Sequence, residues 1–365
     1  MTFLHLRRCI YTLLAISLLA GVAFVLIMCI PAKEKSLSIT HDFGIGFDFS
    51  PYYGTVAVSY PNGSIHNIAR LEGDGAYREL MRRLSLSSSQ HIHRPYHNLG
   101  ESFSDLPRQY WREFRRRLGL PASWDAGTLS KMIRNLRAEA TAYVGESISA
   151  AGISKPHLIA LYTEDLTDAF EYLGLINLEL YRNGPNFYAL PATLAAYAGN
   201  GQGLCANYTD YPRCRDIEME MPERFVLSVS YSYHGLLTSQ ARITSAWGTQ
   251  ESPMAENLSL GYADRDQYQS YFDEVRLYLR APIVQSWLRR NVTGVVLQGD
   301  AAHEPEFREV LEGVVDELLE GEKDIYDRDT VFSAARGTAE MSKRFLYHTR
   351  NVSSLGVQAS GETEL

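Results

Sequence analysis

Residues 43–58 read FGIGFDFSPYYGTVAV, a strand, a turn and a second strand with one carboxylate, Asp48, beside the turn. Loops of this form bind phosphate when backbone N–H groups at the turn point at the anion. An aspartate at a strand end also often does no more than cap a turn, so Asp48 alone does not decide the chemistry. The same pattern returns at 224–243, RFVLSVSYSYHGLLTSQARI, so the chain has two turns of this form.

Strand and helix patterns surround both turns. In each half an opening β-hairpin is followed by segments that alternate between buried strands and amphipathic helices. In the first half, residues 128–151 are predicted to form a helix and residues 157–162, HLIALY, a buried strand. Two halves with the same order of elements predict an internally duplicated, two-lobed α/β architecture.

Four segments, in sequence order, carry a resemblance to a known family: LSKMIRNLRAEATAYVGESISAAGISKPHLIALY (129–162), LPATLAAYAGNG (190–201), VVLQGDAAHEPEFREVL (295–311) and DTVFSAARGTAEM (329–341). Together they resemble the nucleotide-binding domain of DnaK-type chaperones, the seventy-kilodalton heat-shock family of the actin-like ATPase superfamily, over about residues 40–347. The resemblance implies a two-lobed actin-like ATPase fold, which is a duplicated ribonuclease-H-like unit. The family's substrate-binding domain has no counterpart here, so no chaperone-type peptide client is expected.

The resemblance also implies a nucleotide cleft. Asp48 matches the family's aspartate that organises Mg²⁺ through its waters, and the two hairpin turns match its phosphate turns. ATP with Mg²⁺ is the cofactor that such a cleft would bind. The candidate nucleotide-binding residues are Asp48, Ser50, Tyr52, Ser230, Ser232, Gly235, Gly299 and Asp300.

The sequence departs from the family at these turns. Ser50-Pro51-Tyr52 stands where the family has Gly-Thr-Thr, and proline has no N–H to donate to a phosphate. The turn at 230–235 has lost its carboxylate and most of its glycines, and Leu190 replaces a water-positioning glutamate. Phosphoryl transfer depends on positioning and charge neutralisation, so efficient catalysis is not expected.

The leading expectation is a non-catalytic binding or scaffold module, and the alternative is an active ATPase or nucleotide-gated switch with a rearranged site. A small-metabolite kinase is less favoured, because Asp48 is the single candidate carboxylate.

Residues 10–30, IYTLLAISLLAGVAFVLIMCI, carry no charge and follow Arg7 and Arg8. About 20 apolar residues span a bilayer, whereas the apolar part of a signal peptide has about 7–15. The sequence therefore predicts one transmembrane signal anchor, with the body in the secretory-pathway lumen or outside the cell. Lys33 and Lys35 nearly balance the two arginines, and a cleaved signal peptide is the alternative.

Five sequons agree with a lumenal glycoprotein: Asn62, Asn207, Asn257, Asn291 and Asn351. Such sequons are used only on surface loops in a secretory compartment. Beyond residue 30 the chain has only two cysteines, Cys205 and Cys214, in the turn-rich CANYTDYPRC. They form a disulfide in an oxidising compartment or two free thiols in a cytosolic one. Their spacing fits no zinc pattern, so no metal site is expected.

A net charge of −8 argues against a nucleic-acid partner. The one basic run, WREFRRRLG at 111–119, is predicted to be a helix with solvated arginines and with Trp111, Phe114 and Leu118 facing inward. A patch for a membrane surface or an anionic partner is the alternative. The expected partners are thus the membrane and a protein of unknown identity.

The predicted organisation follows from these signals: a short cytosolic N-terminus (1–9), a transmembrane anchor (10–30), a linker (31–40), lobe I (41–200), an inter-lobe loop with the two cysteines (201–223), lobe II (224–347) and a disordered tail (348–365).

Overall fold

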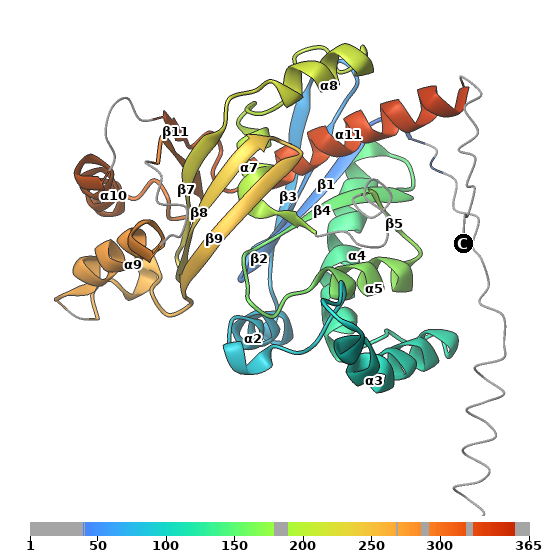
Figure 1. Ribbon diagram of the computed structural model, residues 1–365, viewed down its shortest axis with the longest axis horizontal. Helices are drawn as coiled ribbons and strands as arrows, with labels where there is room; N and C mark the ends of the chain where they lie inside the picture. The colour runs from blue at the N-terminus through green and yellow to red at the C-terminus, as the bar shows by residue number, and fades with distance from the viewer. Residues whose placement is uncertain are drawn as a thin grey trace, which may run out of the picture.

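The computed structural model of the protein describes residues 39, 41–178, 189–267, 269–285, 292–318 and 324–354. The α/β class is confirmed, because the chain forms two mixed sheets with helices around them (Figure 1). None of the described helices is long and apolar enough to cross a membrane. The predicted anchor at 10–30 lies outside the described residues.

The first sheet has the strand order β3-β2-β1-β4-β5, and β6 also pairs with β4. Strands β1, β2 and β3 are antiparallel, whereas β4 runs parallel to β1, and β5 parallel to β4. The sequence pattern predicted this hairpin correctly. Every residue of β1 and β2 is buried, so both faces of these strands are covered, whereas β3 is only partly buried. The strands are β1 (Gly44–Phe49), β2 (Tyr53–Ser59), β3 (Ile65–Glu72), β4 (Ala150–Lys155), β5 (Ile176–Asn177) and β6 (Leu190–Pro191).

The second sheet repeats this order as β9-β8-β7-β10-β11. Its first three strands are antiparallel, and β10 and β11 run parallel to β7. The two halves of the chain thus have the same sheet topology. The strands are β7 (Arg224–Ser232), β8 (Gly235–Ser245), β9 (Gly248–Asn257), β10 (Gly294–Gln298) and β11 (Asp324–Tyr326).

Helices cover both faces of each sheet (Figure 1). The outer face of the first sheet packs on α2, α4 and α5, and that of the second sheet on α9 and α10. The inner faces pack on α11 for the first sheet and on α7 for the second, and α7 and α11 pack on each other. These helices are α2 (Gly75–Leu84), α4 (Trp124–Val144), α5 (Thr163–Leu173), α7 (Ala192–Gly199), α9 (Tyr271–Gln285), α10 (Pro305–Leu318) and α11 (Ser333–Ser354).

Small residues allow α7 and α11 to approach closely. A Cβ atom added at Gly199 would overlap the carbonyl of Ser333, and one at Gly337 would overlap the carbonyl of Ala195. Glycine is therefore required at both positions, because no larger side chain fits between the two backbones.

Two element predictions in the first half were wrong. Helix α4 ends at Val144, before Gly145 with φ 78°, rather than at residue 151. The strand that follows is β4, and residues 157–162, predicted as a strand, are irregular. Pro156 explains the shift, because a residue without an N–H ends the hydrogen-bonded ladder directly after β4. In addition, helix α8 (Tyr211–Met219) lies within the segment 201–223 that was predicted as a loop.

Helix α3 (Leu99–Arg117) has the opposite orientation to the one predicted. Arg112 is only 4% exposed, whereas Trp111 is 56% exposed. The reason is α5, which presents Asp168 toward α3; the Arg112 guanidinium lies 2.6 Å from this carboxylate. A buried carboxylate is costly unless it is paired, so the arginines turn inward and the aromatic residues outward.

Candidate functional site

A cavity lined by both polar and apolar residues lies between the two sheets, at the carboxyl ends of β1, β7 and β10. Open α/β sheets usually bind ligands at the carboxyl ends of their strands. Four of the predicted residues line it, namely Asp48, Ser50, Ser230 and Gly299. Further lining residues, which the sequence analysis missed, are Thr193, Ser228, Thr238, Ser239, Gln298 and Thr330.

The cavity is small. Its free volume is about 40 Å³, and a buried water occupies at least about 10–15 Å³ on this measure. Small-molecule pockets are roughly 300–1,000 Å³ in volume. The cavity therefore has room for a few water molecules but not for ATP with the residues in this arrangement.

Asp48 is buried at the end of β1, with 6% of the residue exposed. Its Oδ1 accepts a hydrogen bond of 2.7 Å from the Ser154 hydroxyl. Burial raises the pKa of the Asp48 carboxyl to about 7. Burial thus disfavours the charged form of the carboxyl, which is the form that would organise Mg²⁺.

The backbone N–H groups of the first turn are not free for an anion. The N–H of Ser50 donates to the carbonyl of Tyr53 at 2.9 Å, and that of Tyr52 points at the Ser50 hydroxyl at 3.5 Å. Pro51 has no N–H. The turn therefore has the shape of a phosphate loop but none of the donors that residues 50–52 would supply.

Tyr52 extends from this turn to the second hairpin. Its hydroxyl lies 2.7 Å from the carbonyl oxygens of both His234 and Leu258, which share its proton. Burial raises the pKa of Tyr52 above its ordinary value, so the hydroxyl stays a donor at neutral pH. A Cβ atom at Gly235 would lie 2.8 Å from the Tyr52 hydroxyl, so the glycine makes room for this contact.

The donors of the second turn are also occupied. The N–H groups of His234 and Gly235 donate to the Ser232 hydroxyl, at 3.3 and 3.1 Å. The N–H of Tyr233 donates to Asp300 Oδ1 at 3.0 Å. Here Ser232 and Asp300 accept the hydrogen bonds that an external anion would otherwise receive.

Asp300 joins the two halves through its other oxygen. Oδ2 accepts a 2.6 Å hydrogen bond from the guanidinium of Arg70 on β3. That guanidinium also lies 4.3 Å from the centre of the Tyr53 ring. An internal carboxylate thus sits between a turn N–H and an arginine, the surroundings that a phosphate group prefers. We call the contacts of Tyr52 and of the Arg70–Asp300 pair the cross-cleft clasp. Arg70 was not predicted as a site residue, because nothing near it in the sequence marks its partner.

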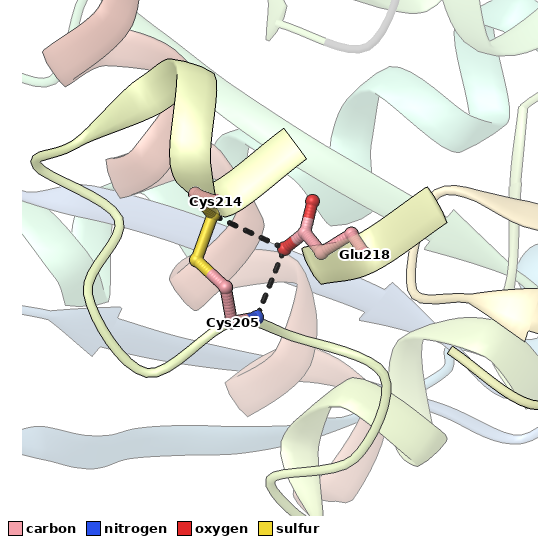
Figure 2. A group of neighbouring side chains, drawn as sticks. All are labelled: Cys205, Cys214 and Glu218. Atoms are coloured by element: carbon pink, nitrogen blue, oxygen red, sulfur yellow. Dashed lines mark hydrogen bonds between the residues drawn. A yellow bond between two sulfur atoms is a disulfide. The ribbon is translucent and has the colours of Figure 1, made fainter. Parts of the chain in front are cut away.

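The two cysteines form a disulfide next to Glu218 (Figure 2). Glu218 Oε1 accepts a 3.0 Å hydrogen bond from the N–H of Cys205 and lies 3.5 Å from Cys214 Sγ. Among the described residues this is the one group of side chains whose ligand atoms are close enough together for a metal. Disulfide sulfurs are not thiolate ligands, and the Arg344 guanidinium lies 3.5 Å from Cys205 Sγ. We therefore interpret the group as a structural link between this loop and α11.

Three sequons can be examined in the structure. Asn62 and Asn207 are exposed, and the Oδ1 of each accepts hydrogen bonds from the hydroxyl residue two positions later. Asn257 is half-buried, and its Nδ2 donates to Glu274 at 3.3 Å. Asn291 and the side chain of Asn351 lie outside the described residues. Glycosylation stays a prediction, and Asn62 and Asn207 are the better placed acceptors.

Comparison of the chain with protein-family models and with curated proteins finds no match.

Proposed function

We propose that this protein is a membrane-anchored lumenal or extracellular glycoprotein whose body is a degenerate actin-like ATPase domain that serves as a non-catalytic binding or scaffold module. The strand order that is repeated in the two sheets supports the duplicated ribonuclease-H-like fold. The central pair of helices, α7 and α11, supports it as well, since the pair connects the two halves.

The observation that carries the proposal is the cross-cleft clasp. Tyr52 and Asp300 both bind the second turn with groups of the protein itself: the Tyr52 hydroxyl donates to the carbonyl of His234, and Asp300 accepts from the N–H of Tyr233. Asp300 also pairs with Arg70 of the first half. The halves are therefore held together without a nucleotide, and the energy of nucleotide binding is not needed for closure. A module held in one arrangement can present a fixed surface to a partner.

The test is nucleotide binding and turnover by the full-length protein in detergent. A ligand that binds only the folded state raises its stability by RT ln(1 + [L]/Kd). We expect no shift of the melting temperature with millimolar Mg-ATP and no phosphate release above background. Turnover that is abolished by Asp48→Asn, but not by the exposed control Asp266→Asn, would overturn the proposal.

An ATP-dependent switch of the same fold is the second candidate. The cavity favours it, because Asp48 and several hydroxyls from both sheets surround one space. The variant Tyr52→Phe/Asp300→Ala separates the two functions, since it removes the clasp and leaves Asp48 in place. Stabilisation of the wild type by ATP supports the switch. Absence of stabilisation in both proteins supports the scaffold.

A further inference from the structure

An uncharged, largely aromatic surface lies on the outer side of α3. We call it the α3 surface; exposed fractions of its residues are 76% for Leu99, 68% for Phe103, 52% for Tyr110, 56% for Trp111 and 82% for the neighbouring Trp124. Every exposed residue from Leu99 to Trp111 is uncharged. Soluble monomers rarely expose a contiguous apolar patch of this kind, and such patches mark sites of interaction.

The charges of α3 are used on its inner side. Arg108 contacts Asp105 and Glu164, and Arg112 contacts Glu164 and Asp168. Because these charges are paired on the inner side, burying the outer side against a partner does not desolvate an unpaired charge. The helix thus presents an apolar side outward at little electrostatic cost.

We propose that the α3 surface binds a lipid bilayer at the level of its headgroups. Tyr and Trp prefer this level, because one part of each ring is apolar and another forms hydrogen bonds. Arginines lie at the carboxyl end of α3, beside Trp111 and Trp124: the Arg115 guanidinium is 5.2 Å from the Trp124 ring centre, and Arg117, which pairs with Glu113, follows. Cations beside an apolar helix face favour binding to anionic lipids.

The geometry favours a bilayer over a protein partner. Helix α3 lies at the periphery, at the lower edge of the view in Figure 1. Protein interfaces carry about one hydrogen bond per 100–200 Å². The outer side from Leu99 to Trp111 has few polar groups for this purpose, and the Ser104 hydroxyl already donates to the Gly100 carbonyl. The sequence also has no sequon between Asn62 and Asn207, so no glycan is expected on this surface.

This inference goes beyond the proposed function, because it holds whether or not nucleotide binds. The test uses the full-length protein reconstituted in vesicles of phosphatidylcholine and phosphatidylserine, with bromine on the acyl carbons nearest the headgroups. We expect the bromines to quench the tryptophan fluorescence, and the quenched component to disappear in Trp111→Phe/Trp124→Phe. Trp247→Phe is the control that keeps it. Equal quenching of the wild type and the Trp111→Phe/Trp124→Phe variant overturns the proposal.

A second variant changes the surface and keeps both tryptophans. In Leu99→Ser/Phe103→Ser we expect the quenched component to fall by about half or more, since two inserted apolar side chains are lost. The matched control is Leu277→Ser/Val284→Ser, which alters two exposed apolar residues of α9. A different result would assign the α3 surface to a second copy of this chain. In that case the tryptophans would not be quenched, and the protein would form a dimer in detergent that Phe103→Ser dissociates. Resistance of the protein to carbonate extraction tests the predicted transmembrane anchor separately. A wrong anchor prediction can therefore be distinguished from a wrong prediction for the α3 surface.

Discussion

The first and second hairpin turns occupy equivalent places in two sheets of the same topology, yet they do different things. The first turn, at residues 50–53, extends a side chain outward, and the Tyr52 hydroxyl reaches carbonyls of the other half. The second turn, at 232–235, has its own N–H groups bound by Ser232 and Asp300.

The difference shows how a duplicated cleft can close without a ligand. One turn supplies the donor and the other the acceptors, and Arg70 with Asp300 supplies one charge from each half. Asp300 binds the N–H of Tyr233, a group that a phosphate loop would leave free for its anion. The space between the two turns is therefore filled by contacts between protein groups rather than left as a void.

The largest effect is expected where the two halves join at the crossing of α7 and α11. Gly337→Ala should lower the free energy of unfolding by about 3 kcal/mol, because the new methyl group overlaps the Ala195 carbonyl. Gly75→Ala is the control, since a Cβ atom there meets nothing within 4 Å. Urea unfolding of both variants measures the difference. Equal midpoints would mean that the crossing is not tight.

The next largest effect on stability is expected at the ends of the equivalent strands β1 and β7. At this place β1 has the carboxyl of Asp48, whereas β7 has the hydroxyl of Ser230. Burial raises the pKa of Asp48 to about 7, so the protein loses stability as pH rises through this value. Asp48→Asn should remove this loss and be more stable than the wild type at pH 8 by about 3 kcal/mol. The gain should shrink as the pH falls from about 7 toward 4, because the carboxyl then becomes protonated in the folded wild type.

Thermal unfolding between pH 5 and pH 8 measures this pH dependence. Asp165 is buried with a pKa raised to about 7 in both proteins, so only the difference between them reports Asp48. Parallel pH profiles of the wild type and Asp48→Asn would contradict the prediction.

Asp300→Ala should remove the acceptor that holds the second turn. We expect a loss of about 2 kcal/mol, because the Tyr233 N–H and the Arg70 guanidinium lose a charged partner. Asp266→Ala, at an exposed position, is the control. Chemical denaturation measures the effect, and high salt should weaken the part that is due to Arg70. A loss no larger than that of the control would argue against the clasp.

The smallest effect is expected for Tyr52→Phe, which removes only the hydroxyl. The loss should be about 1 kcal/mol, since two carbonyls lose one shared donor. Tyr172→Phe is the matched control on an exposed tyrosine. Because Tyr52 and Asp300 act on the same turn, the double variant should lose less than the sum of the single losses. Strict additivity would show that the two contacts are independent.

The sequence predicted well those features that depend on nearby residues. The two hairpins follow from alternating apolar residues, and four of the candidate cleft residues line one cavity. The pairing of Cys205 with Cys214 left two alternatives open in the sequence, and the structure has the disulfide.

Features that depend on distant partners were not predictable in the same way. The orientation of α3 is set by Asp168, 56 residues after Arg112 in the chain. The role of Asp300 depends on Arg70, which lies 230 residues away. Both the apolar residues and the arginines of α3 recur with the spacing of a helix. The sequence alone therefore did not show which of the two sides packs against α5.

The position of α11 has a consequence for how the chain acquires its structure during synthesis. This helix covers β1, β2 and β4, which leave the ribosome long before it. Until residues 333–346 emerge, the inner face of the first sheet has no cover, and its glycine-bearing strand β1 is exposed to other chains in the same compartment. A chaperone that covers exposed apolar surface would therefore act while the first half has emerged and α11 has not.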